Sequence, residues 1–179
     1  YQPDAIATYE VNGATYLVTA NEGDAKDYEG FSEETRVAKL TLDKTMFPNA
    51  DTLQKPEHLG RLKTTTTMGD TDGDGDHDII YAYGGRSFSI WGADGSLVFD
   101  SGNAFENVIA RRSPEVFNAN GGKSEFDDRS DDKGPEPEAL ALGKIEGRTY
   151  AFIGMERNNA IFAYDITLPS DPHMVGYMM

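Results

Sequence analysis

The feature of this sequence that most constrains its fold is an internal repeat of paired strand-like runs. Residues 3–24, PDAIATYEVNGATYLVTANEGD, align with residues 137–158, PEALALGKIEGRTYAFIGMERN, at a constant offset of 134. Each copy has a two-residue turn signal, Asn-Gly or Glu-Gly, between runs rich in β-branched and aromatic residues, which is typical of an antiparallel hairpin. Residues 78–91 align more weakly with the same C-terminal copy, at an offset of 71. We therefore expect one small antiparallel unit to recur along the chain.

The other strand-like runs favour an all-β fold. They are 14–20, 35–42, 78–85, 87–93, 96–102, 138–145, 149–155 and 160–167. Only residues 103–110 are expected to form a short helical turn, with Asn103 as its cap. Recurring antiparallel sheets are typical of β-propeller blades, and the alternative is a β-sandwich whose segments resemble one another by chance.

The spacing of the repeats predicts the domain organisation. We expect residues 1–179 to form one partial β-propeller domain of about three blades, with repeat units near 3–42, 62–102 and 137–179 and long loops at 47–60 and 111–136. Because propellers close with about four to eight blades, the chain is predicted to be a fragment of a larger propeller of the seven-bladed type. The absence of an initiator Met fits this prediction. The remainder of that propeller is then an expected partner.

Composition narrows the classes of partner. The 179 residues include 31 acidic and 16 basic side chains, a net charge of −15, which argues against nucleic acid as a ligand. The chain has no Cys, so disulfides and thiolate metal sites are excluded, and its three scattered His residues disfavour a zinc site. No apolar run reaches the roughly 18 residues of a membrane span.

An acidic tract at residues 69–78, GDTDGDGDHD, predicts a calcium site. Its carboxylates alternate with other residues, at Asp70, Asp72, Asp74, Asp76 and Asp78. The D-x-D-x-D-G spacing is that of a Ca²⁺ loop, in which the first three carboxylates and the fifth bind the ion and Asp76 offers its backbone carbonyl. A hard divalent cation would offset their mutual repulsion and order the loop. The alternative is a disordered acidic tract.

The surroundings of this tract distinguish it from an EF-hand. Tyr81 occupies the position at which an EF-hand has a bidentate Glu, and a strand-like run follows in place of a helix. Residues 70–84 resemble the Ca²⁺ loops of integrin-α-type FG-GAP propeller blades. That resemblance implies a structural ion that fixes a turn between strands.

The repeat also places acidic residues at equivalent strand ends. Glu22 corresponds to Glu156, after the second strand of each copy, and Asp4 corresponds to Glu138. With Arg157 beside them, these residues could hold metals that bind a phosphate. The neighbouring loops add charges, including an acidic stretch at 126–138 whose role stays open. The equally weighted alternative is a solvated acidic rim with surface ion pairs.

Three long segments together are similar to the choice-of-anchor I family. They are DAIATYEVNGATYLVTANEGDAKDY, GDTDGDGDHDIIYAYGGRSFSIW and FDDRSDDKGPEPEALALGKIEGRTYAFIGMER. The resemblance implies a secreted or surface-attached bacterial propeller of the YVTN/WD-repeat-like kind, in a family whose members are labelled alkaline phosphatase, phytase-like or mesenchyme-specific cell-surface glycoprotein. Residues 133–157 also resemble a phytase-like esterase pattern, which would map to Glu138 and Glu156, although Ala139 replaces a Gly of that pattern.

Two functions are predicted from these features. The first is a secreted, periplasmic or cell-surface calcium-binding propeller module that binds an extracellular glycan or protein. The second is a calcium-dependent phosphomonoesterase with Glu22, Glu138, Glu156 and Arg157 near its centre. No P-loop, G-x-S-x-G motif or Cys supplies a nucleophile that local sequence could identify.

Overall fold

The computed structural model describes all residues from Tyr1 to Met179, and the chain divides into two compact units. Unit 1 contains residues 1–23, 84–129 and 133–179, and unit 2 contains residues 24–83 and 130–132. No helix has both the length and the apolar character that crossing a bilayer requires.

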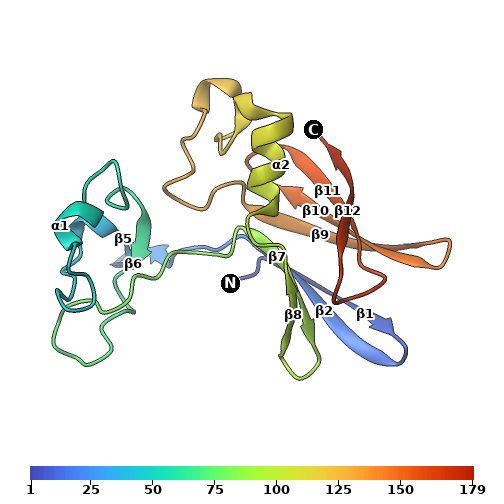
Figure 1. The fold of residues 1–179 in the computed structure, drawn as a ribbon, viewed down its shortest axis with the longest axis horizontal. Coiled ribbons are helices and arrows are strands. Elements are labelled where there is room, and N and C mark those ends of the chain that lie inside the picture. The colour runs from blue at the N-terminus through green and yellow to red at the C-terminus, as the bar shows by residue number, and fades with distance from the viewer. The chain divides into compact units, whose positions relative to one another are not determined.

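Unit 1 is built on two four-stranded antiparallel sheets (Figure 1). The first has the order β1-β2-β7-β8, formed by β1 (Ala5–Val11), β2 (Ala14–Asn21), β7 (Ser87–Gly92) and β8 (Leu97–Asp100). The second has the order β12-β11-β10-β9, formed by β9 (Pro137–Ile145), β10 (Arg148–Met155), β11 (Ala160–Asp165) and β12 (His173–Met178). In each sheet, strands that follow one another within unit 1 are also neighbours in space.

The hairpin turns confirm the repeat that the sequence predicts. Asn12 and Gly13 have φ values of 52° and 79°, and Glu146 and Gly147 have φ values of 50° and 81°. A turn with two successive residues in the left-handed backbone conformation has a twist that matches the right-handed twist of the flanking strands. Asn-Gly and similar pairs adopt this conformation readily and therefore favour two-residue hairpins. The offset of 134 therefore superimposes the β1–β2 hairpin on the β9–β10 hairpin.

The core of unit 1 lies between the apolar faces of the two sheets. Strand β9 packs against β1 and β2, and Phe88, Phe105 and Phe162 are among the largest fully buried side chains. The rings of Phe105 and Phe162 lie 4.7 Å apart, as do those of Phe88 and Tyr164. Because alternate residues of a strand point to opposite faces, these strands each supply one apolar side to this core.

One helix, α2 (Ala104–Arg112), completes that core and confirms the helix predicted near residues 103–110. It buries Phe105 and Ile109, four residues apart on one face. Asn103 stands at the N-cap position without a capping side-chain bond; its Oδ1 instead accepts a hydrogen bond from Asn107 Nδ2 at 2.9 Å. Unit 1 also contains the 3₁₀ helices η2 (Pro114–Val116) and η3 (Lys123–Glu125).

Unit 2 has little regular structure and a small core. Its elements are β3 (Asp27–Tyr28), β4 (Phe31–Ser32), β5 (Glu34–Arg36), η1 (Val37–Lys39), α1 (Ala50–Leu53) and β6 (Lys63–Thr65). They form two two-stranded sheets, β3-β4 and β5-β6. The apolar cluster consists of Leu40, Leu42 and Ala50, with Phe47 and Ile80 packed against it. Such a core is small for a unit that also lacks disulfides.

Two predicted strands require correction. Residues 78–85 form no strand, and 35–42 form only the end of β5 followed by η1. The repeat unit expected at 62–102 is not a separate sheet, because its strands β7 and β8 complete the first sheet, where Ile90 is paired with Val18. The structure is consistent with the predicted all-β class, with two four-stranded sheets where about three blades were predicted, and no sheet is closed.

The core predicts a strong effect of Phe162→Ala. Removal of this fully buried ring should lower the free energy of unfolding by about 3–5 kcal/mol, because a cavity would remain between the sheets and α2. Chemical denaturation measures the change. The control is Ile145→Ala at the 55% exposed end of β9, which should change stability by less than about 1 kcal/mol. Equal losses in the two variants would contradict the proposed position of the core.

Candidate functional site

The first candidate site lies in unit 1, where two equivalent strands end. Glu22 follows β2 and Glu156 follows β10, so the repeat places the two carboxylates at corresponding positions. The backbone N–H of Glu156 donates a hydrogen bond to the carbonyl of Glu136 at 2.9 Å. The end of β10 is thereby fixed to the residue that precedes β9.

Glu136 is the most buried acidic residue of this cluster. It lies between Pro135 and Pro137, its side chain is fully buried, and its φ of 53° is in the left-handed region. A non-glycine residue in that region costs on the order of 1 kcal/mol or more, which the surrounding contacts must offset. Strain of this kind is concentrated at functional sites.

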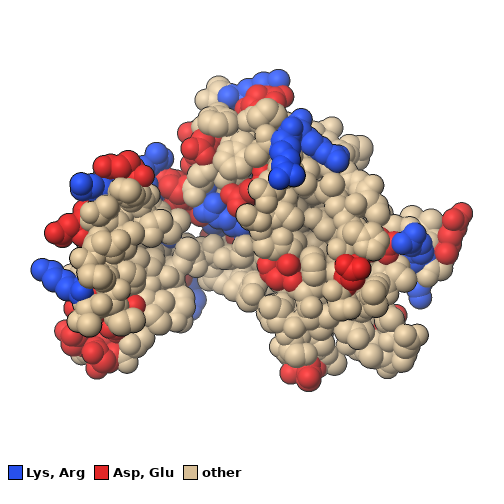
Figure 2. Space-filling view, in the orientation of Figure 1, with Lys and Arg blue, Asp and Glu red and all other residues tan.

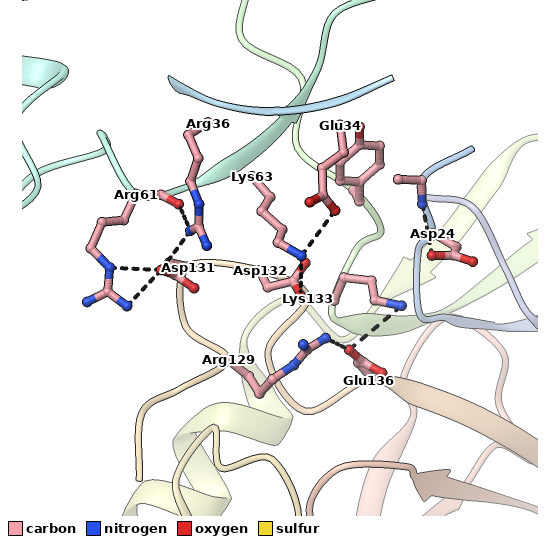
Figure 3. A network of polar contacts seen from close by, with 12 residues as sticks. Asp24, Glu34, Arg36, Arg61, Lys63, Arg129, Asp131, Asp132, Lys133 and Glu136 are labelled. Carbon is pink, nitrogen blue, oxygen red and sulfur yellow. Dashed lines mark hydrogen bonds and ion pairs between the residues drawn. The ribbon is translucent and has the colours of Figure 1, made fainter. Parts of the chain in front are cut away.

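Three basic side chains surround Glu136, and Figure 3 shows two of them, Arg129 and Lys133. Arg157 Nε donates to Glu136 Oε2 at 2.8 Å, and Arg129 Nη2 contacts Oε1. Lys133 Nζ lies 2.7 Å from Glu22 Oε1 and 3.7 Å from Glu136 Oε1. Arg157 Nη1 also lies 3.2 Å from Glu156 Oε1. Burial of the Glu136 charge is therefore compensated by ion pairs and hydrogen bonds.

The carboxylates of this cluster are close enough to bind one cation together. One oxygen from each of Glu22, Glu136 and Glu156 lies within 4.8 Å of the others. Burial raises the pKa of the Glu138 carboxyl, and the charges of Glu156 and Asp4 raise it further. The arrangement thus combines carboxylate oxygens for a metal with Arg and Lys side chains that could bind an anion.

The structure brings together most of the residues predicted here. Glu22, Glu156 and Arg157 share one cluster, and Glu138 lies within electrostatic range of it. The central role of Glu136 was not predicted, because in the sequence it is one of several acids of the stretch at 126–138, whose role stayed open. The Pro residues on both sides of it are the signal that could have distinguished it, since they restrict the backbone at that point.

Two other acids of the 126–138 loop, Asp131 and Asp132, belong to unit 2 and have structural partners within that unit. Asp131 lies 2.8 Å from Arg36 Nη1 and 2.7 Å from Arg61 Nη2, as Figure 3 shows. Lys63 Nζ lies 3.1 Å from Glu34 and 3.3 Å from Asp132. Burial lowers the pKa of Lys63, but the hydrogen bond to Glu34 and the charge of Asp132 outweigh this effect and raise it. These contacts are ordinary ion pairs.

The second candidate site is the acidic loop of unit 2, residues 69–78. The two oxygens of Asp70 accept hydrogen bonds from the N–H of Gly73 at 2.6 Å and of Gly75 at 3.0 Å. Both glycines have positive φ, 82° and 97°, which the turns require. Asp72 Oδ1 accepts from the N–H of Asp74 in the same manner. The loop therefore curls around its own carboxylates.

Three of the five predicted metal ligands converge. Oxygens of Asp70, Asp72 and Asp78 lie within 4.8 Å of one another, whereas Asp74 is outside this group and Asp76 belongs to a different one. Figure 2 shows acidic side chains gathered along the lower edge of unit 2, where Figure 1 places the green loop. The Thr71 hydroxyl also donates a hydrogen bond to Asp78 Oδ2, which lowers the pKa of the Asp78 carboxyl.

The buried network predicts that Glu136→Gln destabilises unit 1. Loss of the charge leaves Arg129, Lys133 and Arg157 without their common partner, and breaking such a buried network costs about 3–5 kcal/mol. Thermal and chemical denaturation measure the loss. Glu146→Gln, in the exposed β9–β10 turn, is the matched control and should be neutral. A stable Glu136→Gln variant would show that the ion pairs contribute little.

Comparisons with known proteins place this chain in a family. The chain is 38% identical to Gigasin-3a of Magallana gigas over 118 residues, which cover 63% of this chain and 41% of that protein. It is 27% identical to the mesenchyme-specific cell surface glycoprotein of Strongylocentrotus purpuratus over 203 aligned positions, which cover 92% of this chain and 25% of that protein. Both curated relatives are animal proteins, so the predicted bacterial source is not supported.

The chain spans less than half the length of either curated relative. No solved structure matches it. The family model described as "Choice-of-anchor I domain" matches residues 1–169 of the chain. This match confirms the resemblance found in the sequence. The chain therefore belongs to the choice-of-anchor I domain family.

Proposed function

We propose that this chain is part of a secreted or cell-surface β-propeller that binds calcium and mediates extracellular binding. The observation that carries the calcium proposal is the convergence of Asp70, Asp72 and Asp78, whose oxygens lie within 4.8 Å of one another. Calcium–oxygen distances are about 2.3–2.6 Å, so oxygens on opposite sides of one ion lie about 4.6–5.2 Å apart. The three carboxylates can therefore contact a single ion.

The sheets of unit 1 support the propeller part of the proposal. Each is a four-stranded antiparallel meander, β9 of the second packs against β1 and β2 of the first, and the two sheets share one apolar core, as neighbouring blades do. On the face of the second sheet opposite the core, Ile161 and Met178 are paired across β11 and β12 and are 43% and 63% exposed. Further blades of a longer protein would cover this apolar face, as the lengths of the relatives allow.

The extracellular location rests on the family and on one relative's name. The Strongylocentrotus purpuratus protein is named a cell surface glycoprotein, and it matches nearly the whole of this chain. Calcium loops of extracellular modules bind with dissociation constants of about 10⁻⁴–10⁻³ M, which extracellular calcium can fill. The chain's net charge of −15 would favour cation binding there. A surface glycan or a protein is the proposed ligand class of the propeller.

Calcium is expected to raise the melting temperature of the full chain, and a chelator should reverse the rise. At about one hundred times the dissociation constant, the ion should add about 2.7 kcal/mol to stability. Asp72→Asn keeps the side-chain acceptor of the Asp74 N–H but removes a charge, so it should greatly reduce this gain. Differential scanning calorimetry with calcium and with chelator measures the effect.

The control for that measurement is a substitution of Asp94, which makes the same kind of local turn without other acids around it. Asp94 Oδ1 accepts a hydrogen bond from the N–H of Ser96 at 3.0 Å in the exposed turn between β7 and β8. Asp94→Asn should therefore respond to calcium as the unmodified chain does. Identical melting of the unmodified chain with calcium and with chelator would refute a stabilising calcium site.

A second function, metal-dependent phosphomonoesterase activity, is favoured by the unit 1 cluster. Glu22, Glu136 and Glu156 could hold a cation, and Arg157, which contacts two of these carboxylates, could turn its remaining N–H groups toward a phosphate. A metal there would polarise the phosphoryl oxygens, while Arg157 and Lys133 would stabilise the negative charge of the transition state. The ester would be hydrolysed by water.

Glu156→Gln tests this second function. Its side chain is 37% exposed, so the substitution should leave the fold intact. If the cluster is catalytic, turnover of a generic phosphomonoester by the longer protein should fall by at least about a hundredfold, since a metal ligand is lost. Assays with calcium, with other divalent ions and with chelator measure it. Unchanged turnover in Glu156→Gln would exclude this carboxylate from catalysis.

A further inference from the structure

We propose that unit 2 holds a second cation position, formed by Asp43, Asp76 and Asp78, beside the one formed by Asp70, Asp72 and Asp78. The inference rests on the proposed function, in which the acidic loop binds calcium. It assigns Asp43, a residue outside the loop and outside any recognisable calcium motif, as a metal ligand. It also makes Asp78 a carboxylate shared by two ions.

Backbone pairing brings Asp43 to the loop. Leu42 and His77 form an isolated parallel bridge between two segments that are far apart in the sequence. The N–H of Asp43 donates to the carbonyl of His77 at 3.1 Å, and the N–H of His77 donates to the carbonyl of Thr41 at 2.9 Å. Because Leu42 belongs to the small core of unit 2, the register of this bridge is fixed by packing as well.

The side chains then converge as the ligands of one ion do. Oxygens of Asp43, Asp76 and Asp78 all lie within 4.8 Å of one another, and all three residues are partly buried. As in the first group, this spacing permits one calcium ion to contact all three at about 2.4 Å. The convergence is not a local turn, since it joins Asp43 to Asp76 and Asp78, which lie more than thirty positions later.

An independent observation at the same place points to a ligand. Asp76 Oδ1 is inaccessible to solvent and accepts no hydrogen bond. An isolated buried carboxylate oxygen is costly, and such atoms in folded proteins nearly always have a partner. The charged groups that act on the Asp76 carboxylate are themselves acids, Asp74, Asp43 and Asp78 among them. A cation between them would supply the interaction that Oδ1 otherwise lacks.

The negative charge of the region is large enough to favour more than one ion. Six carboxylates belong to the two groups and to Asp74. The ion pairs of unit 2 are made elsewhere, by Arg36, Arg61 and Lys63. One divalent ion would leave most of the charge uncompensated, whereas two would offset four of the six negative charges. Asp78 is suited to bridge, because Thr71 donates its N–H and hydroxyl to Oδ2 at 2.8 and 2.6 Å and thereby fixes the carboxylate.

The expected result is a change in the number of ions bound. Unit 2 should bind two calcium ions in the unmodified chain and one in Asp43→Asn. Asn at this position keeps the Oδ1 acceptor for the N–H of Met46, a bond of 2.5 Å, so the local turn is retained. Native mass spectrometry and calorimetric titration with calcium count the ions. Asp51→Asn, an exposed acid at the start of α1, is the matched control and should bind two.

The outcomes separate this inference from the proposed function. One ion in the unmodified chain, or an equal count in Asp43→Asn, would overturn the second position and leave a single loop site. No bound calcium in the unmodified chain would overturn both. If circular dichroism shows that Asp43→Asn does not fold, Asp76→Asn gives the same test, and it too should bind one ion.

Discussion

The packing of one antiparallel sheet on the next is the interaction on which the rest of unit 1 depends. Phe88 and Phe162 come from different sheets, and both are fully buried in one core with α2. Once this core forms, the hairpins β1–β2 and β9–β10 lie in fixed positions, and β9 packs against β1 and β2. The equivalent ends of β2 and β10 then place Glu22 and Glu156 close together. The charged cluster is therefore a consequence of sheet packing.

Much of unit 1 could be predicted because its signals are local. The turns at residues 12–13 and 146–147 require left-handed backbone, and their sequences provide residues that adopt it. The alignment between the copies also predicted that Glu22 and Glu156 occupy equivalent positions. The strand prediction for residues 78–85 was wrong, because their aromatic and β-branched composition resembles that of a strand but no neighbouring strand pairs with them. Strand propensity without a pairing partner does not make a strand.

The missed residues share a physical reason. The role of Glu136 in its cluster, and the role proposed for Asp43, depend on contacts with residues far away in the sequence. Glu136 contacts Arg157 across a separation of 21 residues, and Asp43 reaches the acidic loop through the Leu42–His77 bridge. A local motif such as D-x-D-x-D-G reports ligands that one turn supplies, so it cannot report a ligand that a second segment brings.

The two clusters differ in how their charge is compensated. Around Glu136, Arg and Lys side chains of unit 1 already neutralise the carboxylates, so that cluster can be stable without metal. The acidic loop of unit 2 turns its backbone N–H groups toward Asp70 and Asp72 but pairs no basic side chain with them. Backbone dipoles offset only part of a full negative charge. Because the apolar cluster of unit 2 is also small, bound calcium would, in the proposed function, supply part of the stability of this unit.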